Sequence, residues 1–263
     1  MGDLDDLPDR YTTILCDVWG VIHDGADLYP GVRSRFTRWR EEGRKVVILT
    51  NAPRPADRVE RELASLGLDP SMWHALTSSG QAGIEALTHP PRHVGFCGTQ
   101  WDFKDMEAHG VVFATAQEPH DEICLTGLDE HRTTVAEYEA ELSSWRARDM
   151  LLHCLNPDRV VEHRGEMLVC AGALADAFEE RGGRVKFYGK PETPIFEHAL
   201  ALAGNPPKDE VVMIGDGPAT DMVGAMRVGI SGILVRAGVS GRGEIDWPEA
   251  LGDWRPEMIV PGL

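Results

Sequence analysis

The sequence lacks a long apolar run, paired cysteines and an excess of positive charge. No segment approaches the ~20 apolar residues of a membrane span, and the acidic N-terminus resembles neither a secretory signal nor a transit peptide. The five cysteines include no C-x-x-C pair, which argues against a disulfide framework. A net charge of −17 argues against nucleic acid or an anionic membrane as the main partner. We therefore expect a cytoplasmic protein with reduced thiols.

Short apolar runs rich in β-branched residues alternate with helix-like segments, which is typical of β-α units on a parallel sheet. Residues 12–20 and 45–51 are predicted strands, and helices are expected over 31–42 and from after Arg54 to Gly67. The same alternation returns as strands over 210–217 and 231–238 around a helix over 219–228. The pattern predicts an α/β fold with a parallel sheet. No G-x-G-x-x-G follows the first strand, so a dinucleotide oxidoreductase has no support.

A second set of elements interrupts this core. Strands are expected over 93–98, 111–115, 122–127 and 150–156, with a helix over 134–149. Clusters of proline and glycine at 90–91 and 182–183 mark the boundaries. We predict a core domain built from residues 1–87 and 184–263, with an inserted domain over 88–183.

Polar residues follow the predicted core strands, at the edge where open α/β sheets place their ligands. They are Asp17, Thr50, Asn51, Lys190, Asp216 and Asp221. Each alone fits a cap or a turn, but together they supply the groups that phosphoryl transfer needs. A carboxylate such as Asp17 can form an aspartyl-phosphate if cations offset its repulsion from the phosphate.

Hard oxygen ligands among these residues predict a Mg²⁺ site. Asp17 and Asp216, together with the backbone carbonyl of Trp19, are expected to hold the ion. Lys190 adds a fixed positive charge. Asp221 is expected to orient Lys190 or a metal-bound water, and we count it among the metal-site residues.

Hydrogen-bond donors for the transferring group are expected on two loops. The Thr50 hydroxyl and the N–H groups around Gly20 and Asn51 can donate to its equatorial oxygens. The net negative charge of the chain does not oppose this, because a phosphate site needs only one or two cations and a few N–H groups.

Four segments in order resemble the successive motifs of the haloacid dehalogenase (HAD) superfamily. They read LCDVWGVIHDG, ILTNA, YGKPETPIF and GDGPATDM. Their order and spacing resemble class IIA, which contains the N-acetylglucosamine-type, 4-nitrophenyl-type and pyridoxal phosphatases. SSGQAGIEAL, LNPDRVV and CAGAL extend the resemblance over nearly the whole chain.

The resemblance implies a Rossmann-like core with an α/β cap inserted between the second and third motifs. It implies Asp17 as the nucleophile, Thr50 and Lys190 as phosphate ligands, and Asp216 as a side-chain metal ligand with Asp17. Asn156, Pro157 and Asp158, which also fit an ordinary turn, would lie in a cap loop that faces the site and helps to select the substrate. Such caps open and close and often accompany dimers, which makes a homodimer a candidate assembly.

Trp19 departs from the family pattern. Phosphatases of the family that this chain resembles have the pattern D-x-D at the first motif, where the second carboxylate protonates the leaving alcohol. This sequence has Trp19 in its place. General acid–base catalysis is worth ~10²- to 10⁴-fold, so ordinary phosphate esters would turn over slowly.

Four explanations of Trp19 stay open. One is a leaving group that needs little protonation, as in an acyl phosphate, an acidic alcohol or a phosphonate. His23 or Asp24 can stand in as the acid. The protein can bind a phosphorylated metabolite without turnover. Trp19 can instead mark a subfamily in which it stacks on the substrate.

The favoured hypothesis is a Mg²⁺-dependent phosphohydrolase that acts on a small phosphorylated metabolite through an aspartyl-phosphate. The alternative is a regulatory protein of the same fold that binds such a metabolite with little or no turnover. Phosphonate hydrolysis ranks lower, because Lys104 and Lys186, the candidate imine lysines, have no supporting motif.

Overall fold

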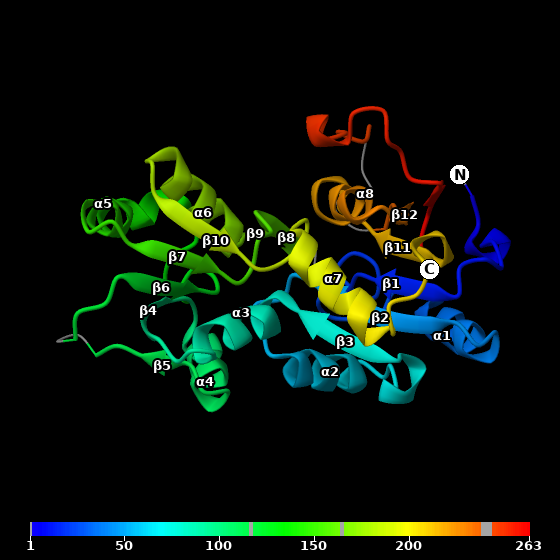
Figure 1. Cartoon of the computed structure of the whole chain (residues 1–263), viewed down its shortest axis with the longest axis horizontal. Helices are drawn as coiled ribbons and strands as arrows, with labels where there is room; N and C mark the ends of the chain where they lie inside the picture. The colour runs from blue at the N-terminus through cyan, green and yellow to red at the C-terminus, as the bar shows by residue number, and fades with distance from the viewer. Residues whose placement is uncertain (1, 116–117, 164–165, 238–243) are drawn as a thin grey trace.

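The computed structural model describes residues 2–115, 118–163, 166–237 and 244–263. One half is a six-stranded sheet in the order β13-β12-β11-β1-β2-β3 (Figure 1). Its strands are β1 (Thr13–Cys16), β2 (Lys45–Thr50), β3 (Ala75–Ser78), β11 (Val211–Gly215), β12 (Ser231–Val235) and β13 (Met258–Val260). Every pair in it is parallel. The predicted α/β fold with a Rossmann-like core is confirmed.

Helices cover both faces of this sheet. The helices α1 (Val32–Glu41) and α2 (Ala56–Ser65) pack on the side of Ile14 and Cys16. On the other side, α7 (Thr193–Leu202) and α8 (Val223–Val228) pack against Leu15 and its neighbours. A parallel strand buried on both faces reads as a continuous apolar run. This explains why the first strand could be recognised from sequence.

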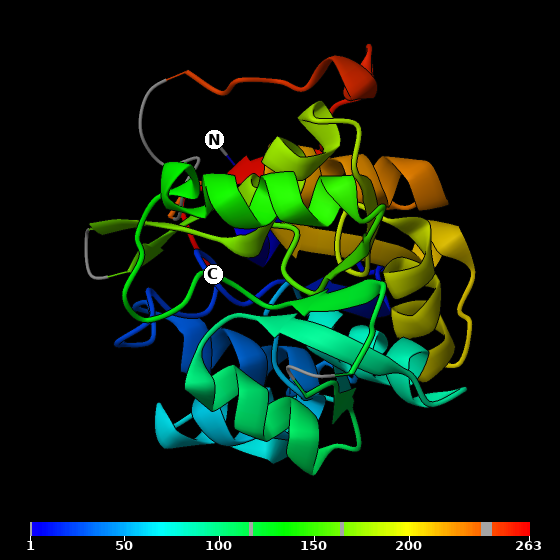
Figure 2. The same cartoon turned by 90° about the vertical axis from the view of Figure 1, so that its left-hand side faces the viewer.

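A second parallel sheet, in the order β10-β7-β6-β4-β5, forms the other half (Figures 1 and 2). Its strands are β4 (His93–Cys97), β5 (Val112–Phe113), β6 (Glu122–Leu125), β7 (Leu151–Cys154) and β10 (Arg184–Phe187). The helices α5 (Glu139–Ala147) and α6 (Ala171–Glu180) pack on one face. On the other face lie α3 (Ser79–Thr88) and α4 (Gln100–Ala108).

The end of this second unit lies beyond the predicted boundary. We placed the boundary at residue 183, but β10 follows it and pairs with β7 in the second sheet. The two glycines end α6 rather than the unit, since Gly182 adopts a positive φ of 76° there. We retain the division into core and cap as a proposal, with the second junction after Phe187.

An antiparallel hairpin, β8 (Val160–His163) and β9 (Glu166–Val169), was not predicted. It lies between the two halves in Figure 1. The predicted strand over 231–238 is observed as β12, and residue 238 lies outside the described residues.

The five cysteines are free and buried, as expected for thiols that take no part in a disulfide framework. Among the helices in the described ranges, none combines the length and apolarity needed to cross a membrane.

Candidate active site

Three buried carboxylates meet at the carboxyl edge of the core sheet. Asp17 follows β1 and Asp216 follows β11, its neighbour, while Asp221 lies on the π-helical turn Pro218–Met222. The Asp17 N–H donates to the Ile214 carbonyl at 2.9 Å, which extends the pairing of the two strands to the site. One oxygen of each carboxylate lies within 4.8 Å of those of the other two. The sequence prediction that these residues converge is therefore supported by their positions.

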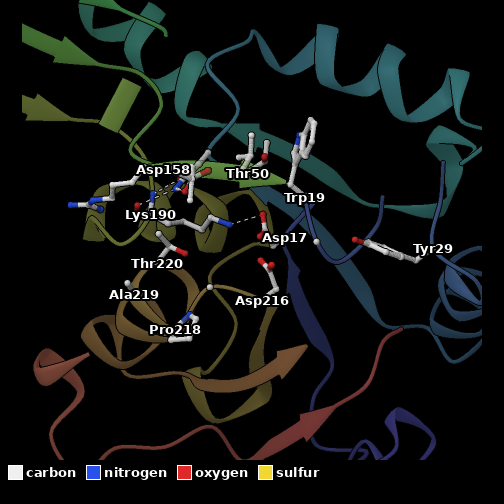
Figure 3. A pocket seen from close by; sticks show the side chains of 16 residues that line it. Asp17, Trp19, Tyr29, Thr50, Asp158, Lys190, Asp216, Pro218, Ala219 and Thr220 are labelled. Carbon is white, nitrogen blue, oxygen red and sulfur yellow. Dashed lines mark hydrogen bonds and ion pairs between the residues drawn. The ribbon is translucent and has the colours of Figure 1, made fainter. Parts of the chain in front are cut away.

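Lys190 is the buried cation of this cluster. Its Nζ lies 2.6 Å from Asp17 Oδ1 and 2.7 Å from Asp221 Oδ1, with its side chain 2% exposed. Figure 3 shows the Lys190 side chain reaching toward Asp17. Burial alone would lower the pKa of Lys190, but the carboxylates of Asp17 and Asp221 outweigh it and raise that pKa. Lys190 is therefore a fixed positive charge.

The charge of the cluster fits a divalent cation. Burial raises the pKa of Asp17 well above its usual range, and the nearby Asp221 and Asp216 add to that rise while Lys190 opposes it. Three carboxylates against one ammonium leave an excess of buried negative charge when all are ionised. Hard carboxylate oxygens at this spacing suit Mg²⁺. The residues present thus fit the predicted metal, with Trp19 lining the same space two residues after Asp17.

Thr50 and Asn51 end β2 and turn into the site. The Asn51 side-chain Oδ1 accepts from the Lys190 backbone N–H at 2.7 Å, and its Nδ2 donates to Asp158 at 2.8 Å. The Thr50 hydroxyl lines the cavity and accepts from the N–H of Ala52 at 3.2 Å. The Asn51 side chain therefore holds other site residues, and Thr50 stays the predicted phosphate donor.

The loop after Asp17 differs in part from the expectation. Gly20 adopts a positive φ of 77° and donates its N–H to the His23 carbonyl at 3.1 Å. That N–H is engaged within the loop. The predicted donation from Gly20 to a phosphate is therefore not supported by this geometry.

His23 and Asp24 do not line the cavity that contains Asp17. The His23 ring is 1% exposed, lies 5.0 Å from the Trp19 ring, and accepts the Gly25 N–H on Nδ1 at 2.9 Å. Burial lowers the pKa of His23. The Asp24 carboxylate accepts the N–H groups of Ala26 and Asp27, each at 2.9 Å. Both residues thus have structural partners in the loop, and neither lines the cavity in which the leaving group is expected.

The tripeptide Asn156, Pro157 and Asp158 follows β7 in the cap and is both a turn and part of the site. Asn156 Oδ1 accepts the Asp158 N–H at 3.2 Å, which is the local turn. The Asp158 carboxylate accepts from Asn51 across the junction of cap and core and lines the cavity. Burial raises the pKa of Asp158. Asn156 lines a neighbouring cavity but not this one.

A cavity of about 240 Å³ contains the Asp17 and Lys190 side chains (Figure 3). Its remaining lining includes residues that the sequence reasoning missed. They are Tyr29, Arg159, Val160, Val161, Gly217, Pro218, Ala219 and Thr220. Residues 159–161 directly follow the predicted turn, and 217–220 lie within the fourth motif. Their closeness in sequence to predicted site residues could therefore have identified them as lining residues. Tyr29 had no such signal.

Comparison with known families is consistent with this geometry. A family model described as haloacid dehalogenase-like hydrolase matches residues 14–112, and one described as HAD-hydrolase-like matches residues 187–263. The acid sugar phosphatase of Staphylococcus aureus is 26% identical over 234 residues, with 88% of each chain covered.

Solved structures are similar over most or all of the chain. A haloacid dehalogenase-like hydrolase from Brucella suis is 30% identical with a TM-score of 0.88, covering 100% of this chain and 99% of that one. The glycerol phosphate phosphatase of Mycobacterium tuberculosis, solved in complex with calcium, is 21% identical with a TM-score of 0.66. That comparison covers 87% of this chain and 67% of the other and concerns the fold alone.

Proposed function

Because the chain belongs to the haloacid dehalogenase-like hydrolases, we propose that it hydrolyses phosphate monoesters through an aspartyl-phosphate on Asp17. The observation that carries the proposal is the placement of the Lys190 ammonium 2.6 Å from Asp17, beside the carboxylates of Asp216 and Asp221. A buried nucleophile next to fixed positive charge is what attack on an anionic phosphate requires.

Mg²⁺ bound by Asp17, Asp216 and the Trp19 carbonyl would neutralise charge on the phosphoryl oxygens. Asp221 would then act through Lys190, whose ammonium it holds in place at 2.7 Å. A separate hydrogen bond holds Asp221 itself in place, because its Oδ2 accepts the Gly217 N–H at 2.9 Å.

The residues of the chain divide the reaction between them. An Asp17 oxygen attacks phosphorus while the bond from phosphorus to the leaving oxygen breaks. Lys190 and the Thr50 hydroxyl stabilise the equatorial oxygens. Water then attacks phosphorus, releases inorganic phosphate and restores the Asp17 carboxylate.

We propose a sugar or polyol phosphate as the substrate. The name of one relative, acid sugar phosphatase, supports this class. The cavity beside Asp17 adds apolar surface from Trp19, Tyr29 and Val161, on which the carbon face of such a substrate can pack. Neither Lys104 nor Lys186 lines the cavity, which leaves phosphonate cleavage through an imine without support.

The test is release of inorganic phosphate from a panel of sugar, polyol and aryl phosphates with and without Mg²⁺. We expect release that needs the metal and is lost in Asp17→Asn, which keeps the shape of the nucleophile. If the wild type binds Mg²⁺ and beryllofluoride but releases phosphate from no member of the panel, the regulatory alternative replaces this proposal. Trapping of an aspartyl-phosphate that decays at the rate of turnover would exclude that alternative.

A further inference from the structure

A second cavity, of about 380 Å³, lies between the cap and the loop that follows β2. Part of its lining is apolar, with Leu128, Met167 and Leu168. Other lining residues carry charged and hydroxyl groups. They include Arg54, Glu62, Thr99, Asp102, Asp129, Arg132 and Thr133.

The charges in this cavity are already paired within the protein. Arg54 lies 2.7 Å from Glu62, and Arg132 lies 2.6 Å from Asp129. The buried Asp102 carboxyl accepts a hydroxyl hydrogen bond from Thr99 at 2.8 Å. Such a cavity has little unpaired charge to offer an ionic ligand. It suits an uncharged polar group with one apolar face, such as the alcohol part of a sugar or polyol phosphate.

The two cavities share three lining residues, Trp19, Asp158 and Val161. The first contains the Asp17 carboxylate, so the phosphoryl group belongs there. In a substrate that spans both cavities, the scissile bond therefore lies beside the residues that the two cavities share. Among the described residues, Asp158 is the carboxyl that lines both cavities. Asp102, Glu62 and Asp129 line the second alone, and Asp17 and Asp216 line the first alone.

The surroundings of Asp158 suit a proton donor. The residue is held in place through Oδ1, which accepts from Asn51 at 2.8 Å. Burial raises the pKa of Asp158, an effect that Lys190 and the Asn51 hydrogen bond oppose and that Asp221 adds to. A carboxyl with a raised pKa keeps its proton at higher pH, as a general acid must.

We propose that Asp158 donates the proton to the leaving oxygen, in place of the carboxylate that Trp19 replaces, and that the second cavity holds the leaving alcohol. This rests on the proposed phosphatase function. In the first step Asp17 forms its bond to phosphorus, the ester bond breaks, and the Asp158 proton moves to the leaving oxygen to give the neutral alcohol. In the second step the Asp158 carboxylate takes a proton from the attacking water. Phosphate is released and both carboxyl groups return to their starting states.

The test compares Asp158→Asn with the wild type on two kinds of substrate in Mg²⁺. The alkoxide expelled from an alkyl phosphate is a poor leaving group that needs a proton, whereas the 4-nitrophenolate and acetate expelled from 4-nitrophenyl phosphate and acetyl phosphate need little protonation. We expect kcat to fall by about 10²- to 10⁴-fold on alkyl phosphates and by less than about tenfold on the activated ones. Asparagine keeps an oxygen that can accept from Asn51, so a role in holding the cap is retained.

Two further variants complete the experiment. Asp149→Asn changes an exposed carboxyl that lines neither cavity, and its effect on kcat should not depend on the leaving group. Trp19→Asp placed in the Asp158→Asn background should restore turnover of alkyl phosphates. An equal loss on both kinds of substrate in Asp158→Asn would overturn the inference and leave the proposed function intact. Absence of phosphate release by the wild type from every substrate would instead refute the proposed function.

Discussion

Replacing Lys190 with methionine is expected to destabilise the metal-free protein. Methionine keeps an unbranched apolar side chain but leaves the carboxylates of Asp17 and Asp221 without the ammonium that lies 2.6 and 2.7 Å from them. Removal of one partner from a buried ion pair costs about 3–5 kcal/mol. At ~2–4 °C per kcal/mol for a chain of this size, the thermal midpoint should fall by on the order of 10 °C.

The loss of stability depends on pH because the carboxyl groups can take up a proton. Burial and neighbouring carboxylates already raise the pKa of Asp17, and loss of Lys190 raises it further. A group with a raised pKa in the folded state contributes stability below its unfolded pKa of ~3.9, and that stability is lost as pH rises through the folded value. The thermal midpoint of the variant should therefore approach that of the wild type near pH ~4.5 and fall increasingly below it toward pH ~8.

The assay is thermal unfolding followed by circular dichroism across this pH range, in the presence of a chelator. Lys208→Met is the matched control, since Lys208 is exposed and lies away from the site. Addition of Mg²⁺ should recover part of the lost stability in Lys190→Met, because the ion supplies positive charge to the same carboxylates. A midpoint equal to that of the control at every pH would refute the electrostatic account of the site.

Asp216→Asn is expected to abolish the rise in thermal midpoint that Mg²⁺ with beryllofluoride produces in the wild type, because it removes a carboxylate from the cluster of three; an unchanged rise would contradict the metal assignment. Gly172→Ala should cost about 1–3 kcal/mol in unfolding free energy, since its Cβ would lie 2.2 Å from the Pro157 carbonyl oxygen. Urea denaturation checks this, with Gly127→Ala, whose Cβ meets nothing within 4 Å, as the control. His153→Asn should reduce the loss of stability below pH ~6.5, because burial lowers the pKa of His153 in the fold; equal slopes of midpoint against pH in variant and wild type would count against it.

The core and the motif residues were predictable because their signals are local. Residues 14–16 of β1 and 211–214 of β11 are apolar, and Asp17 and Asp216 directly follow these two strands. Adjacent parallel strands bring such residues to one edge. The place of each of these two side chains in the site therefore follows from the residue at which its strand ends.

The elements that were missed have weaker local signals. The strand β10 alternates charged and apolar residues over only four positions and directly follows two glycines. The hairpin of β8 and β9 carries charged residues and places Met167 and Leu168 on an exposed surface. Their pairing depends on tertiary packing, to which single-sequence patterns are insensitive.

The tertiary contacts of the site were beyond the sequence for the same reason. The hydrogen bond between Asn51 and Asp158 joins residues 107 positions apart. Burial of the His23 ring against Trp19 likewise depends on how the loop folds back on the core. Residue type indicated that His23 could act as an acid, but only its surroundings decide whether it faces a substrate.

The amide of Asn51 has a consequence for exchanging caps between relatives. It binds the backbone of Lys190 through one atom and the cap residue Asp158 through another, and only Tyr188 and Gly189 separate the last cap strand from Lys190. A transplanted cap that lacks a carboxyl at the position of Asp158 would therefore disturb the position of Lys190 as well as substrate choice. A chimaera of this fold should therefore take Asn51, the carboxyl of Asp158 and the two-residue connection to Lys190 together from the same parent.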